Sequence, residues 1–228
     1  MKANSQRVPG KNFRSFAGQP LYKWVLQTLL KIEVIEKIVI NTDAQQILEQ
    51  SGIPKSDRIL IRNREESLRG NTVSMNRIIE NDISAVPAET YLMTHTTNPL
   101  LGTQTVLSAL QEYQDRLSKG YDSLFSVNRY QTRFYRKNGD PINHDPDNLI
   151  QTQDLEPWYE ENSNLYLFSK DSFSRTHSRI GKKPILFETP MIESADIDDA
   201  NGWHLAEMIQ LSKMIADSTH RNLDESKK

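Results

Sequence analysis

The stretch "EKIVINTDAQQILEQSG" (residues 36–52) shows most directly how this chain folds. It begins with a short apolar run rich in β-branched residues, which is typical of a buried strand. A helical pattern follows at once, with Asp43 placed to cap its first turn and Gly52 placed to end it. The stretch therefore predicts a strand that passes directly into a helix.

The same alternation extends along the chain in both directions. Further strands are expected at 58–63, 89–99, 121–129, 162–169 and 183–190. Helices are expected at 19–32, 72–85, 103–120, 172–181 and 198–218. Strands that alternate with helices predict an α/β fold with a mostly parallel central sheet and helices on both faces. A length of 228 residues fits a single domain that covers residues 1–228.

One segment, at about 130–160, interrupts this alternation. It is polar and mostly β-like, with turn signals at 138–141 and 145–146. Its apolar content is too low for a separate domain, so we expect it to reach across to a second subunit and form a homodimer. The aromatic and basic residues at 129–137 also allow an RNA-binding strand, but an arm or an acceptor-site edge fits the surrounding fold better.

Composition excludes several classes of protein. The chain has no cysteine, which rules out disulfides and cysteine–metal sites. Its net charge of −2 argues against a protein that binds nucleic acid or membrane surfaces in general. No run of about 18 apolar residues occurs, so no membrane span is expected. A cytoplasmic location is the default expectation.

The first 14 residues form a polar loop with the composition of a phosphate site. Backbone N–H groups of such a loop can surround phosphates while cations neutralise their charge. The side-chain donors are Lys2, Ser5, Arg7, Lys11 and Asn12. Neither GxxxxGK[ST] nor GxGxxG is present, so this is not one of the common nucleotide loops. A solvated basic arm is the alternative interpretation.

This loop resembles the opening motif of the acylneuraminate cytidylyltransferase family. Lys2 stands where the family has arginine, Ser5 where it has serine and Gln6 where it has lysine. Pro9 and the pair Lys11-Asn12 match the end of the motif. The resemblance continues at "INTDA" (40–44), "IRNREESLRGNTVS" (61–74), "HTTNPLL" (95–101) and "SADIDDANGWHLAE" (194–207). It implies a nucleotide-diphospho-sugar transferase-like fold.

The family places an apolar first strand before this loop. Met1 falls inside the motif, so the first strand is missing from this sequence, and we expect the true start to lie upstream or the chain to be truncated. The resemblance also implies that His95, Thr97 and Asn98 lie beside the cytosine and ribose of CTP. It places Arg62 near the nucleotide, whereas Arg64 and Arg69 are interpreted as surface charges.

Asp196 and Asp198 form the most compact carboxylate pair beside this loop. Carboxylates two residues apart on an extended segment point to the same side and can hold one Mg²⁺ ion against substrate phosphates. The alternative is that an aspartate here only caps the following helix. We expect Asp196 and Asp198 to bind metal and Asp199 to cap the helix.

The resemblance implies transfer of CMP from CTP to a sugar acid, either sialic acid or a related nonulosonate, with release of pyrophosphate. It assigns catalysis to Lys2, Lys11, Asp196 and Asp198. It assigns acceptor binding to Gln153, Asp154, Tyr159 and Asn162. Thr152 replaces an arginine that would pair with the acceptor carboxylate, and Arg133 or Arg136 is a candidate substitute.

Three alternatives stay open. One is a different acceptor, such as a phosphonate. Another is a catalytically impaired or regulatory paralogue, which the replacements at Lys2 and Gln6 favour. The third is a sugar-1-phosphate nucleotidyltransferase, but those enzymes usually open with a glycine-rich loop that has few lysines.

Overall fold

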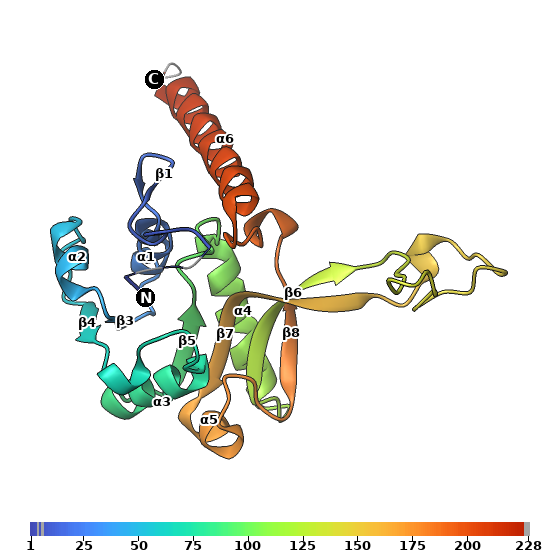
Figure 1. Cartoon of the computed structure of the whole chain (residues 1–228), viewed down its shortest axis with the longest axis horizontal. Helices are drawn as coiled ribbons and strands as arrows, with labels where there is room; N and C mark the ends of the chain where they lie inside the picture. The colour runs from blue at the N-terminus through green and yellow to red at the C-terminus, as the bar shows by residue number, and fades with distance from the viewer. Residues whose placement is uncertain (4, 6, 226–228) are drawn as a thin grey trace.

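The computed structural model describes residues 1–225 except residues 4 and 6, so Gln6 of the opening motif lies outside the described residues (Figure 1). The strands are β1 (Ser15–Phe16), β2 (Gln19–Pro20), β3 (Ile38–Thr42), β4 (Ile59–Asn63), β5 (Thr90–Thr94), β6 (Ser123–Tyr130), β7 (Trp158–Ser169) and β8 (Pro184–Glu188). The α-helices are α1 (Tyr22–Leu30), α2 (Gln45–Gln50), α3 (Met75–Ala85), α4 (Thr103–Leu117), α5 (Lys170–Thr176) and α6 (Ala200–Glu225). Short 3₁₀ helices cover Glu66–Leu68, Thr152–Asp154 and Met191–Glu193.

The α/β class is confirmed, but the sheets are mixed rather than mostly parallel. Strands β3 and β4 pair in parallel, and a separate four-stranded sheet has the order β5-β7-β6-β8. Strand β7 runs antiparallel to both β5 and β6, whereas β6 and β8 are parallel. After β6 the chain makes a long excursion and returns as β7. Because β7 runs back along β6 and pairs with it, the two strands are antiparallel. The missing first strand stays a prediction.

Helices cover both faces of the four-stranded sheet, as the alternation predicts. Leu165 and Leu167 of β7 point to one face and pack with α4. Tyr166 and Phe168 point to the other face and pack with α3 and α5. This arrangement follows from the period of two in a strand, which sends neighbouring side chains to opposite faces.

The strand–helix junction after β3 differs from the expected one. Asp43 does not cap a helix: α2 begins at Gln45, and the backbone N–H of Ala44 donates to Thr42 Oγ1 at 3.0 Å instead. The carboxylate of Asp43 accepts a hydrogen bond from the Ala3 backbone N–H at 2.6 Å. Asp43 is therefore used to hold the opening loop against the end of β3.

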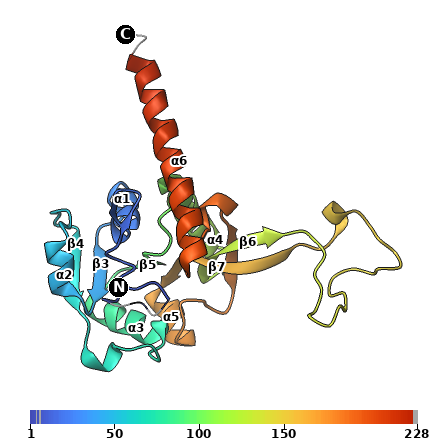
Figure 2. The same ribbon diagram turned by 45° about the horizontal axis from the view of Figure 1, so that its top comes forward.

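The start of α6 is tied to the opening segment through a small apolar cluster. Trp203 is buried edge-on against Phe16, with the ring centroids 5.3 Å apart, and Ile197 is fully buried in the same cluster. The Gly202 N–H donates to Asp199 Oδ1 at 2.8 Å, which confirms Asp199 as the residue that caps this helix. Beyond its first turns, α6 projects away from the body (Figure 2).

The excursion between β6 and β7 extends from the body as an arm, residues 131–157, carried on the ends of these two strands (Figure 1). The stacked rings of Phe134 and Trp158, with centroids 5.3 Å apart, join the arm to the end of β7. Its described residues contain one 3₁₀ turn and an isolated bridge between Tyr135 and Pro141. Within the described part of the chain, no helix has the length and apolarity that crossing a bilayer requires.

Candidate functional site

The opening loop is anchored at the end of β5 by a buried asparagine. The amide of Asn12 donates to the Lys2 carbonyl at 2.8 Å, and its oxygen accepts from the Thr96 hydroxyl at 2.6 Å. The loop turns at Gly10, whose φ of +62° is a left-handed conformation that glycine adopts without strain. Lys2 and Asn12 of the loop are therefore held beside the point where β5 ends.

Lys11 reaches from this loop to the segment that precedes α6. Its ammonium donates to the backbone carbonyl of Ile197, the residue between Asp196 and Asp198 in the sequence. Burial lowers the pKa of Lys11, although Asp196 and Asp198 act in the opposite direction. An anion at this position would favour the charged form of this lysine.

Asp196 and Asp198 lie on one side of the segment because Ile197 between them points into the core. The Ile197 N–H donates to the Thr97 carbonyl at 3.3 Å, which holds the segment beside β5. The pKa of Asp196 is raised, first by surrounding protein atoms and then by Asp198, while a hydrogen bond with Thr97 opposes the rise. Asp196 is nevertheless exposed to solvent at the surface of the protein.

The aspartate pair fits Mg²⁺ that is shared with a substrate. Among the described residues, no three His, Cys, Asp or Glu side chains gather closely enough to hold a metal alone. Mg²⁺ commonly uses one or two carboxylates together with substrate phosphates, so a pair is sufficient. The guanidinium of Arg7 lies 2.8 Å from the Asp198 carboxylate, in an ion pair exposed to solvent.

His95 occupies the next position along the end of β5. Burial and the nearby Arg179 guanidinium lower the pKa of His95 to about 4, and Lys11 contributes in the same direction. The imidazole is therefore neutral near pH 7 and can donate one hydrogen bond and accept another. Both cations are therefore close enough to His95 to act on the pKa of its imidazole.

A second cluster beside His95 was not predicted from the sequence. Arg179 lies over the ring of Tyr166, 4.0 Å from the ring centroid, and its Nη2 donates to the Tyr166 hydroxyl at 3.0 Å. Glu161 lies 3.4 Å from the same guanidinium nitrogen and accepts from the Tyr166 hydroxyl. These residues come from β7 and from the loop after α5, which no local sequence signal connects.

Several predicted nucleotide residues lie apart from this group or have other partners. Arg62 pairs with Asp82 at the edge of α3, and the ammonium of Lys2 turns to the Gly70 carbonyl at 2.8 Å. Asn98 is buried, and its amide donates to the Ser163 carbonyl at 2.8 Å. This contact with β7 accounts for a polar residue at this buried position without a nucleotide. Ser5 lies in the loop without a hydrogen bond to another described residue.

Two of the predicted acceptor residues lie on the arm and two lie on β7, rather than at the loop. Gln153 and Asp154 lie in the exposed 3₁₀ turn of the arm, and Tyr159 is exposed at the start of β7. Asn162 is buried, and its amide donates to Asn128 Oδ1 at 2.9 Å and to the Thr189 hydroxyl at 2.7 Å. Only Asn162 lies close to the site, and its amide hydrogens already have partners.

The prediction that Arg64 is a surface charge is wrong. Its side chain is 3% exposed, and it donates through Nε to Asn41 Oδ1 and through Nη2 to the Asn41 carbonyl, each at 2.8 Å. Asn41 in turn donates to Asp82 at 2.8 Å. This arginine is therefore part of the polar network that joins the ends of β3 and β4.

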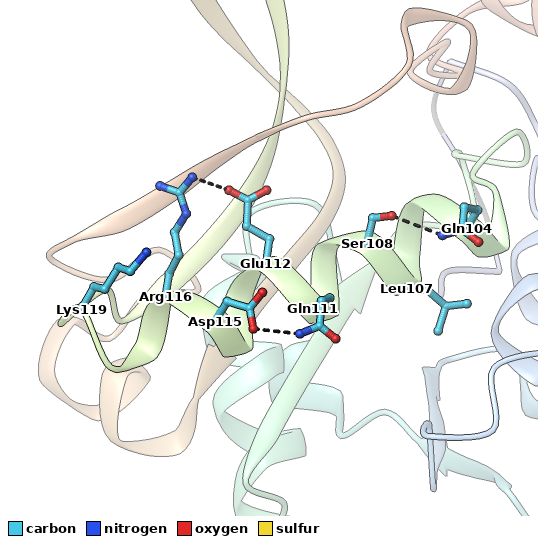
Figure 3. Close-up of a pocket in the computed structure, with 8 residues that line it drawn as sticks. All are labelled: Gln104, Leu107, Ser108, Gln111, Glu112, Asp115, Arg116 and Lys119. Atoms are coloured by element: carbon cyan, nitrogen blue, oxygen red, sulfur yellow. Dashed lines mark hydrogen bonds and ion pairs between the residues drawn. The ribbon is translucent and has the colours of Figure 1, made fainter.

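The pocket in Figure 3 lies elsewhere, on the outer face of α4. Its lining comes from this helix and the turn after it, and neighbouring side chains pair along the helix. Glu112 and Arg116 are 2.9 Å apart, and Gln111 donates to Asp115 at 2.8 Å. These are ordinary i, i+4 contacts of a solvated helix face, so we do not regard this surface as the functional site.

A family model described as "Cytidylyltransferase" matches residues 1–218. The chain belongs to this cytidylyltransferase family. It is 26% identical over 213 residues to N-acylneuraminate cytidylyltransferase A of Danio rerio, covering 90% of this chain and 48% of that protein. It is 24% identical over 221 residues to N-acylneuraminate cytidylyltransferase of Escherichia coli O18:K1:H7, covering 93% and 51%. The chain thus spans about half the length of these curated relatives.

Solved structures support the fold. The structure of CMP:2-keto-3-deoxy-manno-octonic acid synthetase complexed with CTP matches with a TM-score of 0.63 and 14% identity, over 93% of this chain and 96% of that chain. The 4-diphosphocytidyl-2C-methyl-D-erythritol synthase of Anaerococcus prevotii matches with a TM-score of 0.63 and 10% identity, over 91% and 92%. At these identities the similarity establishes a nucleotidyltransferase-like α/β fold.

Proposed function

We propose that this protein transfers CMP from CTP to a sugar acid and releases pyrophosphate. The observation that carries the proposal is the meeting of Lys11 with Asp196 and Asp198 beneath the opening loop. A cationic side chain, a carboxylate pair and a polar loop are the groups that nucleotidyl transfer needs at a triphosphate. Membership of the cytidylyltransferase family supports cytidine as the nucleoside.

Most of this chemistry is positioning and charge neutralisation. An acceptor hydroxyl forms a bond to the α-phosphorus and loses its proton to water. The bond from that phosphorus to the bridging oxygen breaks as pyrophosphate leaves with the electron pair. Lys11 and Arg7 would neutralise charge that grows on the phosphate oxygens. The backbone N–H groups around Gly10 would add neutral donors.

Asp196 and Asp198 would hold the divalent cation in this scheme. When bound, Mg²⁺ supplies Lewis-acid stabilisation of the phosphate oxygens. Thr97 keeps Asp196 in place by hydrogen bonding, and the buried Ile197 fixes the direction of both carboxylates. Asp199 stays with the helix and takes no part.

A sugar acid is the acceptor class that the relatives favour. They include a pseudaminic acid cytidylyltransferase of Campylobacter jejuni, 22% identical over 123 residues and 52% of each chain. We extend that acceptor class to this protein and place the reaction in the cytoplasm, where CTP is made. We also propose a homodimer, because the acceptor residues expected on the arm can approach a site only if the arm reaches another subunit.

Pyrophosphate release from CTP tests this function. The protein is incubated with CTP and Mg²⁺ and a panel that contains sialic acid, related nonulosonates, 2-keto-3-deoxy sugar acids and a phosphonate. Acceptor-dependent pyrophosphate with a sugar acid supports the proposal, and reactions with ATP and without acceptor are the controls. Turnover with the phosphonate alone would show that the acceptor is a phosphonate and not a sugar acid. Binding of CTP without any turnover would favour the impaired or regulatory paralogue.

A further inference from the structure

Helix α6 exposes an apolar face to solvent. Large apolar residues recur along it at spacings of three and four, so they lie on one side of the helix: Leu205, Met208, Leu211, Met214 and Ile215. Met208 and Ile215 are 68% and 67% exposed. The opposite side packs on the body through Trp203 and Ala206. The exposed side is therefore not the one that holds α6 to its own chain.

This face also lacks charge. Over residues 204–216, no exposed side chain of α6 is an aspartate, glutamate, lysine or arginine. The charged residues of this stretch turn to the body instead. Glu207 accepts a hydrogen bond from the Ala17 N–H at 2.8 Å, and Lys213 donates to the Leu100 carbonyl at 3.4 Å. A solvated helix face normally carries charges, whereas the core of a protein interface is depleted of them and enriched in methionine.

The size of the α6 face decides between possible occupants. From their exposed fractions, its five apolar side chains offer on the order of 500 Å² of surface, in the upper part of the range for the largest patch on a monomer. The arm offers on the order of 400 Å² through Tyr135, Ile142, Leu149 and Ile150. A stable interface buries roughly 800 Å² of each partner. A pair of α6 helices or a pair of arms would be too small alone, but an interface that uses both surfaces of each copy is large enough.

The directions of α6 and the arm allow each to cover the other in a symmetric pair. In both views the two elements leave the body in different directions, so the arm does not cover α6 of its own chain (Figures 1 and 2). A two-fold axis that runs between these directions exchanges them. It lays each arm along α6 of the other copy, and the same contact forms twice.

We propose that the exposed face of α6 is the docking surface for the arm of a second copy of this chain. This inference rests on the homodimer of the proposed function and deepens it, because it names the surface that the arm reaches. Leu149 and Ile150 of one copy pack against Met208 and Ile215 of the other. Because α6 begins directly after the segment with the aspartate pair, the contact also connects the dimer to the candidate site.

Cross-linking tests which surfaces meet. The chain has no cysteine, so introduced cysteines react without a background. Ile150→Cys on the arm and Met208→Cys on α6 are combined in one chain, treated with a bifunctional maleimide and separated on a denaturing gel. A cross-linked dimer is expected from the double variant and little of it from either single variant. As much dimer from Ile150→Cys alone would show arms that meet each other, and as much from Met208→Cys alone would show paired helices. Either result would overturn the proposal.

Substitution of the α6 face tests its contribution to the dimer. Met208→Gln with Ile215→Gln removes apolar area but keeps residues that the helix accepts. Because the contact forms twice, the dissociation constant of the dimer should rise by about 100-fold or more in sedimentation measurements. Ile47→Gln with Leu117→Gln is the matched control, since both residues are exposed apolar positions on other helices, and it should leave the constant unchanged. An unchanged far-UV circular dichroism spectrum shows that α6 stays helical.

These measurements need no turnover, so they separate this inference from the proposed reaction. A monomeric unaltered protein, or a dimer that the α6 double variant does not weaken, would overturn the inference. Sugar-acid turnover by a protein whose arms cross-link only to each other would overturn this inference and leave the reaction standing. A dimer that cross-links arm to α6 but releases no pyrophosphate with any acceptor would support the inference and overturn the reaction.

Discussion

Lys11 and Asp196 carry opposite charges, yet burial shifts the pKa of each in the direction that favours its neutral form. The pKa of Lys11 is lowered and that of Asp196 is raised, so their mutual attraction is weaker than the loss of water around them. A phosphate beside the lysine and a cation beside the aspartate would each favour the charged form. At the scale of single residues, this is the arrangement that we expect of a site whose ligands bring charge.

Replacement of either metal aspartate tests this organisation. Asp196→Asn and Asp198→Asn keep the shape of the side chain but remove a charge that would hold Mg²⁺. We expect turnover to fall roughly 10²-fold or more at saturating CTP, because the cation counters charge that grows in the transition state. The free energy of unfolding should change little or rise, since two nearby carboxylates repel each other without a cation. Pyrophosphate release and urea unfolding measure the two effects.

Asp199 supplies a matched control for this prediction. Its carboxylate accepts from the Gly202 N–H at 2.8 Å, and asparagine caps helices about as well as aspartate. Asp199→Asn should therefore keep most of the activity. Near-normal turnover of both Asp196→Asn and Asp198→Asn, or damage from Asp199→Asn alone, would contradict the metal assignment.

His95 predicts a pH dependence of stability. Its pKa of about 4 in the folded protein lies below the ordinary value of 6.5, so between these values the unfolded chain binds more protons. The contribution of neutral His95 to the free energy of unfolding is fully present above about pH 6.5 and is lost as the pH falls toward 4. His95→Gln should reduce the difference in unfolding free energy between pH 7 and pH 5 by about 2 kcal/mol. The same pH difference in both proteins would show that His95 is not the titrating group.

Residue roles could be predicted where neighbours in sequence are also neighbours in space. The alternation around Ile197 was enough to place Asp196 and Asp198 on one side. In contrast, Arg179 meets Tyr166 only because the loop after α5 folds back beneath β7, and the burial of Arg64 depends on Asn41 of another strand. Contacts of this kind depend on tertiary packing and leave no periodic signal in the sequence.

At the scale of elements, local patterns predicted most strands and helices but not how the strands pair. Strand β3 and helix α4 appear within a few residues of the expected bounds because β-branched runs and helical spacing are local properties. The split between β3–β4 and the four-stranded sheet, and the antiparallel direction of β7, are set by distant partners. The end of β3 shows the same limit, since Asp43 holds Ala3 rather than a helix.

The arm is one of two projecting elements with exposed apolar side chains, the other being α6. Leu149 is 62% exposed, Ile150 is 44% exposed and Tyr135 is 55% exposed, on an arm that extends away from the body (Figure 1). Apolar side chains gathered on a projecting segment mark an interface. We predict a two-fold dimer formed through the arm, with a dimeric mass by light scattering at micromolar concentration.

Substitution of the arm should weaken that dimer. Leu149→Ser with Ile150→Ser removes apolar area from the predicted interface, and each 1.4 kcal/mol lost corresponds to about a tenfold weaker association. Val34→Ser is the control, because Val34 is 71% exposed in the turn between α1 and β3. A monomeric mass for the unaltered protein with full activity would rule the dimer out, and equal dissociation of both variants would place the interface elsewhere.

At the scale of the whole molecule, the site joins parts that are far apart in the chain. Lys11 is hydrogen-bonded to Ile197, and Asn12 is hydrogen-bonded to Thr96. A nucleotide bound at the opening loop would therefore contact that loop, the end of β5 and the segment before α6 at once. Binding to the folded state alone stabilises it by about 2.7 kcal/mol when the ligand is at 100 times its Kd. For a chain of this length, each kcal/mol raises Tm by roughly 2–4 °C.

CTP with Mg²⁺ should therefore raise Tm by several degrees, and by more than ATP or GTP at the same concentration. The family to which the chain belongs favours a pyrimidine, and a purine would have to fit in the same space beside His95 and Thr97. Differential scanning fluorimetry with each nucleotide, with and without Mg²⁺, measures the preference. Asp196→Asn should lose the part of the shift that depends on Mg²⁺, while Asp199→Asn should keep it. Equal shifts with all three nucleotides would remove the basis for cytidine selection, because stabilisation follows affinity and the three differ only in the base.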